Sequence, residues 1–179
     1  MKPIDLSNMQ QQSLFDNYQR ALGKVIGNLH SLEMLLRLFL HNVDSERYGF
    51  TPPEVNLDKI KAGDIVGENY LSNYDSLGKL VHRYNKLVDS KNATELRVDE
   101  VVIELRDALG HGRILGQQPA PPFRLYRFGR PSGNHKVRVR RVSELTESEL
   151  VGNIHVLFEE LKKVEEACKR FCPNVFGKP

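Results

Sequence analysis

The fold is decided by residues 18–43, YQRALGKVIGNLHSLEMLLRLFLHNV. Apolar residues recur in this stretch at spacings of three and four, which places them on one face of a helix: Leu22, Val25, Leu29, Leu32, Leu36, Phe39 and Val43. The pattern predicts one long helix from about Asn8 to Val43. Because Gly23 and Gly27 weaken its middle, we expect a bend or a break there.

Further stretches repeat this helical spacing. It predicts helices over residues 70–88 and 98–109, and a short helix over residues 57–66. A long C-terminal helix follows Thr146-Glu-Ser-Glu149, a capping box in which the threonine and the glutamate each satisfy a free backbone donor. Pro173 ends that helix.

Two β-prone runs interrupt the helices. They are Phe123–Phe128 and Lys136–Val142, and turn-forming residues separate them, which predicts a β-hairpin at about residues 123–142. We therefore expect a mostly α fold in a single domain of residues 1–179. It would be a helical bundle of four to five helices, with the basic β-hairpin inserted before the C-terminal helix.

The composition excludes several classes of protein. With 179 residues, of which 40% are hydrophobic, the chain can bury the core of one domain without metal or disulfide staples. No apolar run approaches the ~18 residues that a membrane span needs, and the start of the chain lacks the apolar stretch of a secretory signal. Cys168 and Cys172 cannot form a disulfide framework, which favours a reducing compartment. We therefore expect a cytoplasmic protein without a membrane partner.

The charge is distributed unevenly along the chain. The net charge is +3, yet the stretch from Ala108 to Ser143 contains no acidic residue and carries a local charge of +8. The rest of the chain is therefore mildly acidic. This asymmetry favours a nucleic acid as the partner of the basic segment, and the alternative is a hairpin whose charges pair with acidic helices of the same fold.

The residues best suited to catalysis are concentrated at positions 104–113, ELRDALGHGR. On an ideal helix Asp107 and His111 lie about 40° apart, so the carboxylate can accept a proton from the imidazole and fix its tautomer. His111 closes the helix, where the dipole favours the protonated ring, and Gly110 and Gly112 end it because glycine enters the left-handed region at little cost. A cationic imidazole beside the guanidinium of Arg106 suits the handling of a phosphate group.

Arg106-Asp107-x-x-x-His111 resembles the R-[N/D/H]-x(4–6)-H signature of the HEPN (higher eukaryotes and prokaryotes nucleotide-binding) superfamily. The resemblance extends over roughly residues 14–171, because in that family too the motif ends a helix of the bundle and long helices precede and follow it. It implies a HEPN-like bundle and a metal-independent endoribonuclease without a cofactor, a hydrolase that works as a homodimer with a composite site. It also implies a role as a toxin or in defence against phage, beside an antitoxin or another defence-system partner protein.

The resemblance also assigns roles to residues. Arg106 and His111 would be catalytic, with a ribose 2′-hydroxyl attacking the adjacent phosphate, and Asp107 and Glu33 would support them. The basic residues that would hold the RNA backbone are Arg113, Arg124, Arg127, Lys136, Arg138 and Arg140. The alternative function is a non-catalytic RNA-binding or structural helical-bundle module of a larger complex.

Several residues keep a second interpretation. Arg106 can form a surface ion pair, and His111 can end a helix without any chemistry. Glu33 falls inside the apolar arc of the first helix, where its partner is either Arg106 or, at i,i+4, Arg37.

Two other pairs of residues are open to more than one interpretation. Tyr126 and Phe128 alternate with arginines, which suits base stacking or the packing of the hairpin on the bundle. Cys168 and Cys172 have the spacing of a ligand pair, but no second pair completes a zinc site, so we expect core residues and no metal.

Overall fold

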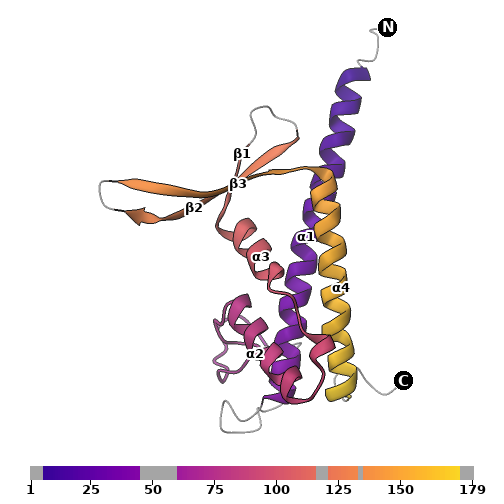
Figure 1. Ribbon diagram of the computed structural model, residues 1–179, viewed down its shortest axis with the longest axis vertical. Helices are drawn as coiled ribbons and strands as arrows, with labels where there is room; N and C mark the ends of the chain where they lie inside the picture. The colour runs from indigo at the N-terminus through magenta and orange to yellow at the C-terminus, as the bar shows by residue number, and fades with distance from the viewer. Residues whose placement is uncertain (1–5, 45–59, 116–120, 133–134, 174–179) are drawn as a thin grey trace. The chain divides into compact units, whose positions relative to one another are not determined.

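The computed structural model describes residues 6–44, 60–115, 121–132 and 135–173, which are mostly helical with one small sheet (Figure 1). The helices are α1 (Leu6–Val43), α2 (Leu77–Ser90), α3 (Val101–His111) and α4 (Glu147–Phe171), with a short 3-10 helix η3 (Thr94–Leu96). The strands are β1 (Arg113–Leu115), β2 (Phe123–Ser132) and β3 (Lys136–Leu145). The prediction of a mostly α chain with a hairpin before its last helix is confirmed.

The chain divides into two compact units. The first, called the sheet unit, contains the described residues up to Leu29 together with Val101–Phe158. The second, called the helical unit, contains His30–Glu100 and the described residues from Glu159 onward. Both α1 and α4 contribute residues to each unit, and the single domain of the sequence analysis stays a prediction.

Helix α1 runs without interruption through Gly23 and Gly27, so the expected break is wrong. Each glycine weakens a helix by about 1 kcal/mol. Burial of the apolar stripe outweighs that cost, since Val25, Leu32 and Leu36 are completely buried. Within the described residues, no helix is both long enough and apolar enough to cross a lipid bilayer.

Helix α2 begins at Leu77 rather than at residue 70, and Ser76 is its N-cap. The preceding residues are held out of the helix by asparagine side chains. The side-chain Oδ1 of Asn69 accepts from the backbone N–H of Leu71 at 2.7 Å. The side-chain Oδ1 of Asn73 accepts from the backbone N–H of Asp75 at 3.1 Å. Such local bonds compete with helical ones, which the apolar spacing alone does not reveal.

Helix α3 likewise begins later than predicted, at Val101. Val98 lies outside the helix, and the amide side chain of Asn85 exchanges two hydrogen bonds of 2.9 Å with its backbone. The short helix predicted over residues 57–66 is absent from the described part of that range, 60–66, which forms a turn and irregular chain. Residues 57–59 lie outside the described residues.

Helix α4 begins as predicted. The backbone N–H of Glu149 donates to the Thr146 hydroxyl at 3.2 Å, and the backbone N–H of Thr146 donates to the Glu149 carboxylate at 3.0 Å. The capping box is therefore confirmed.

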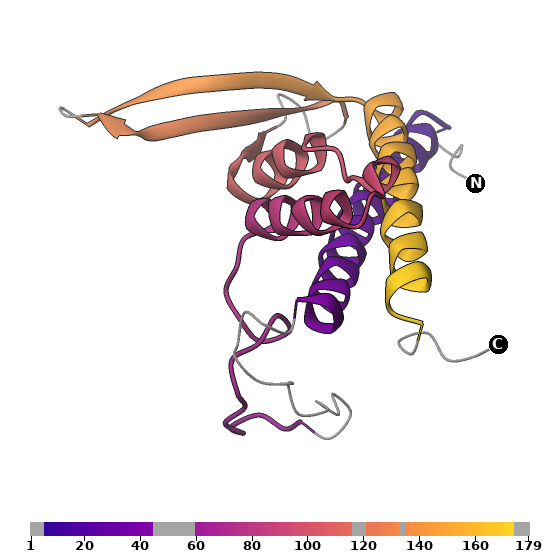
Figure 2. The same cartoon turned by 60° about the horizontal axis from the view of Figure 1, so that its bottom comes forward.

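The sheet is antiparallel with the order β1-β2-β3. Strands β2 and β3 extend further than predicted, and β1 was not predicted at all. In the ladder Leu125 lies opposite Ser143 and Arg127 opposite Arg141, so these four side chains share the face that α3 lies against (Figure 2). We call this the inner face, and the face that bears Arg113, Arg124, Tyr126 and Val142 the outer face.

Each unit has its own apolar core. In the sheet unit, Tyr18 of α1 packs its ring edge-on against Phe123 of β2, with the ring centroids 4.9 Å apart. In the helical unit, Phe39 of α1 packs in the same way against Tyr84 of α2, also at 4.9 Å. The Tyr84 hydroxyl donates to the carbonyl of Leu96 at 2.9 Å, so this buried polar group is satisfied.

Candidate functional site

The candidate site lies in the sheet unit, at the C-terminal end of α3. The Nη1 atom of Arg106 is 3.2 Å from Nε2 of His111, the last residue of the helix. The imidazole is exposed, and about a third of the Arg106 side chain is accessible to solvent. The two residues predicted to be catalytic are thus in direct contact at the surface.

The chemistry of the two groups limits how they can bond. A guanidinium only donates hydrogen bonds, so a bond between them requires Nε2 of His111 to be the acceptor. A ring nitrogen that can accept a hydrogen bond can also act as a general base. The protonated ring expected from the helix dipole stays a prediction.

The hydrogen bond expected between Asp107 and His111 is not formed among the described residues. The carboxylate of Asp107 instead lies 3.3 Å from Nη1 of Arg106 and 3.5 Å from Nη2 of Arg127, which reaches it from the inner face of β2. Two guanidinium groups attract a carboxylate more strongly than one neutral imidazole does. The spacing on the helix was correct, but the competing arginine comes from a distant part of the sequence.

Gly112 brings the end of α3 close to the sheet. A Cβ at this position would meet the carbonyl oxygen of Ala108, would lie 2.5 Å from Cδ1 of Leu125 and 3.3 Å from the carbonyl oxygen of Tyr126. The φ angle of Gly112 is not in the left-handed region, so the reason given for this glycine in the sequence analysis is wrong. The position requires glycine because of space, and the chain directly after His111 comes close to β2.

A second ion pair lies one helical turn before the first. Arg141, directly opposite Arg127 in the β2–β3 ladder, reaches Glu104 of α3 at 3.8 Å. Like charges that face each other across strands repel. Asp107 and Glu104 offset that repulsion, and two arginine–carboxylate pairs connect α3 with the inner face.

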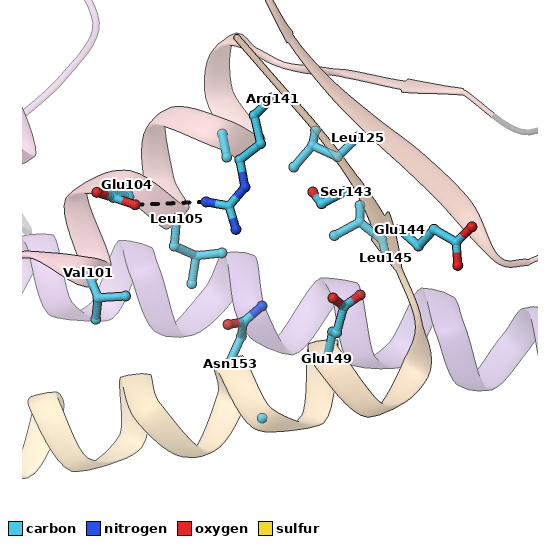
Figure 3. A pocket seen from close by; sticks show the side chains of 12 residues that line it. Val101, Glu104, Leu105, Leu125, Arg141, Ser143, Glu144, Leu145, Glu149 and Asn153 are labelled. Carbon is cyan, nitrogen blue, oxygen red and sulfur yellow. Dashed lines mark ion pairs between the residues drawn. The ribbon is translucent and has the colours of Figure 1, made fainter.

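A cleft of about 290 Å³ adjoins the second pair, between α3, the inner face and the first turns of α4 (Figure 3). In it Arg141 reaches from β3 to Glu104, and Leu105 and Leu145 form apolar walls. Neither Glu104 nor Arg141 was assigned a role from the sequence. In the alternating pattern of β3, Leu145, Ser143 and Arg141 share one face. This pattern would have predicted that Arg141 lies on the same face as the buried Leu145.

The predicted RNA-binding residues divide into two groups. Arg113 and Arg127 lie beside the motif, and Nη1 of Arg113 donates to the carbonyl oxygens of Gly112 at 3.1 Å and His111 at 3.4 Å. The other four predicted residues lie on β2 and β3 and have exposed side chains: Arg124, Lys136, Arg138 and Arg140. Arg124 lies 3.4 Å from Glu144. Their exposure leaves these side chains accessible to a polyanion.

Glu33 belongs to the helical unit. Its carboxylate pairs with Arg37 at 2.9 Å, so the i,i+4 interpretation is confirmed. Arg37 also donates to the backbone carbonyls of Tyr70 at 2.7 Å and Asp75 at 2.9 Å. Glu33 therefore helps to fix the chain before α2, and its support of Arg106 stays a prediction.

Both cysteines are buried near the end of α4, as expected of core residues. A hydrogen bond with Cys172, together with burial, raises the pKa of the Cys168 thiol. Within the described residues, no group of three or more histidine, cysteine, aspartate or glutamate side chains is arranged to hold a metal ion.

No protein-family model matches the chain, and neither curated proteins nor solved structures include a match to it.

Proposed function

We propose that the protein is a metal-independent endoribonuclease of the HEPN type, in which Arg106 and His111 act on an RNA phosphate. The observation that carries this proposal is the 3.2 Å contact between Arg106 Nη1 and His111 Nε2 at the exposed end of α3. Arg113 and Arg127 lie next to this pair, and Asp107 is the single carboxylate in contact with it among the described residues. The surplus of positive charge suits a phosphate diester.

The reaction begins when a phosphate takes the place of His111 as the partner of Arg106. Arginine then binds two phosphate oxygens, and Nε2 of His111 is released with its lone pair free. The imidazole takes the proton of the neighbouring ribose 2′-hydroxyl, whose oxygen attacks the phosphorus. Arg106 stabilises the charge that develops on the phosphorane oxygens.

The bond from phosphorus to the 5′-oxygen then breaks. That oxygen leaves with a proton from a protonated imidazole, and the products are a 2′,3′-cyclic phosphate and a 5′-hydroxyl end. In the homodimer that the HEPN resemblance implies, His111 of a second copy would supply this proton. One motif then provides the base while the other provides the acid.

Asp107 positions Arg106 and Arg127 and contacts no reacting atom in this mechanism. Its carboxylate orients one guanidinium from α3 and one from β2 toward the same surface. The exposed arginines of β2 and β3 hold the RNA backbone without reading its sequence. A toxin or phage-defence enzyme held in check by a partner protein remains the proposed biological setting.

The test is cleavage of a labelled RNA in the presence of EDTA, with analysis of the product ends. We expect 2′,3′-cyclic phosphate and 5′-hydroxyl ends, and no cut at a position where a 2′-deoxynucleotide replaces the ribonucleotide. Products with 3′-hydroxyl ends, or activity that EDTA abolishes, would contradict the mechanism. RNA binding without any cleavage would favour the non-catalytic RNA-binding module.

A further inference from the structure

Two aromatic rings stand side by side on the outer face of the sheet. Tyr126 and Phe128 are separated by one residue on β2, and their ring planes are nearly parallel, at 11°, with centroids 6.4 Å apart. Residues two apart on a strand point to the same face, about 6.6 Å from each other. The ring spacing therefore follows the strand repeat, and the two rings together form an aromatic surface on this face.

This surface is accessible and is extended by aliphatic side chains from β3. Val142 lies directly opposite Tyr126 in the ladder, and Val139 lies opposite Phe128. The phenyl ring is 39% exposed, and half of each valine is exposed. An exposed apolar patch on a sheet marks a binding surface more often than a structural accident.

The surroundings of the patch are basic. Arg113 is the ladder partner of Tyr126, and Arg124 precedes it by two residues on the same face. Both guanidinium side chains are exposed. Alternating aromatic and basic side chains on an open sheet fit a polyanion with flat apolar parts, because phosphates pair with arginine and bases stack on rings.

The patch also begins next to the catalytic motif. Arg113 follows His111 by two residues, and the Tyr126 carbonyl lies where a side chain on Gly112 would meet it. A strand that starts immediately after the motif thus links His111 to the aromatic surface. Because Tyr126 faces away from α3, a nucleotide chain with one phosphate at Arg106 would pass around the edge of the sheet beside Arg113 to reach Tyr126.

We propose that Tyr126 and Phe128 form a stacking platform for unpaired bases, so that the substrate of the site is single-stranded RNA. This inference rests on the proposed function for the position of the cleaved phosphate. In a duplex both faces of every base are covered by its neighbours, so only unpaired nucleotides can use such a platform. The basic outer face favours RNA over an apolar protein segment as its occupant.

The test measures binding apart from cleavage. The probe is a short single-stranded oligonucleotide with 2′-O-methyl riboses, which cannot be cut, carrying one 2-aminopurine whose fluorescence falls on stacking. We expect the wild type to quench this fluorescence, and Phe128→Ile or Tyr126→Ile to lose the quenching and about 5-fold or more of the affinity. Isoleucine keeps the strand propensity of both positions.

Two controls keep the result interpretable. Val137→Ala changes an exposed aliphatic residue of the same ribbon and should keep the quenching. Phe128→Trp enlarges the ring and should keep or raise the affinity, which tests the platform even where an isoleucine variant does not fold. An RNA duplex of the same sequence should bind without quenching.

Unchanged affinity and quenching in the folded isoleucine variants would overturn the platform. Equal quenching of the probe fluorescence in the duplex and in the single strand would also overturn it. So would isoleucine variants that lose self-association while they keep their affinity for RNA. Failure of the platform leaves cleavage by the wild type intact. Failure of the proposed function would instead leave the uncut probe bound and quenched, so the two failures are distinguishable.

Discussion

The guanidinium of Arg106 touches the imidazole of His111, five positions further along the chain, with Nη1 3.2 Å from Nε2. On an ideal helix that separation turns two side chains about 140° apart. The contact forms because arginine is long and because His111 is the last residue of α3. It makes Arg106 the side chain that holds the ring, a role that the spacing had assigned to Asp107.

Gly112→Ala should destabilise the sheet unit by about 1–3 kcal/mol, because the new methyl group would overlap the side chain of Leu125 and the carbonyl of Ala108. Urea denaturation measures the loss. Gly110→Ala is the matched control, since its methyl group would meet only Arg106 side-chain atoms at 3.8 Å or more. That variant should be neutral or gain up to about 1 kcal/mol. Equal effects of the two substitutions would refute the close approach at Gly112.

Asp107→Asn should weaken cleavage by about 10- to 100-fold, because Arg106 and Arg127 lose the charge that orients them. RNA affinity should rise a few-fold, since one carboxylate no longer competes for the arginines. Single-turnover rates and equilibrium binding measure the two effects. Glu104→Gln, which removes the neighbouring partner of Arg141, should strengthen binding without slowing cleavage. Slower cleavage in both variants would show that loss of either carboxylate disturbs α3, and would contradict a specific role of Asp107 in orienting the arginines.

Arg83→Ala should lower the free energy of unfolding by about 1–3 kcal/mol, because it leaves a buried carboxylate short of partners. Asp44 is 5% exposed and receives two bonds of 2.6 Å from Arg83, besides the hydroxyl of Tyr70. Arg97→Ala removes an exposed pair with Asp89 and should change stability by less than about 1 kcal/mol. Denaturant titration measures the free energy of unfolding of both variants. An equal loss of stability in the two would mean that the burial of Asp44 does not make its ion pair more stabilising than an exposed one.

Acid should weaken the fold through His41. Burial lowers the pKa of this histidine below its ordinary value of 6.5, and its Nδ1 is buried without a hydrogen-bond partner among the residues that the structure describes. The unfolded chain therefore binds a proton more readily than the folded one, so stability is lost as the pH falls below about 6.5. His41→Gln removes the titrating group and should flatten the dependence between pH 7.5 and 5.5, measured by urea denaturation (roughly one unit on either side of the free histidine pKa). An identical slope in wild type and variant would exclude His41 as the cause.

The sequence predicted the elements whose signal is local. The apolar stripe of α1, the capping box of α4 and the alternation of β2 are each contained in one short stretch, and all three are present. The beginnings of α2 and α3 were misplaced. There Asn69, Asn73 and Asn85 bind backbone groups with their side chains, and such bonds depend on conformation rather than on hydropathy.

The site was predicted in its residues but not in its contacts. Arg106 and His111 are side by side, whereas Asp107 turns to Arg127, twenty residues further along the chain. Strand β1 was not predicted because three residues are too short for a recognisable strand pattern. The close approach at Gly112 could not be predicted either, because it depends on the position of β2. The Asp107–Arg127 pair and the close approach at Gly112 both depend on contacts between α3 and the sheet. The hydrophobic periodicity of a helix or strand does not predict such contacts.

Single-turnover cleavage of single-stranded RNA by Arg106→Ala, by His111→Ala and by the variant that combines them tests whether the Arg106–His111 pair cuts RNA. Each single substitution should slow cleavage by about 10²- to 10⁴-fold, and the combined variant should be no slower than the worse of the two, because residues that act as a unit are not additive. His155→Ala, which changes another exposed helical histidine, should cleave as the wild type does. Cleavage at the wild-type rate by folded His111→Ala would contradict the account.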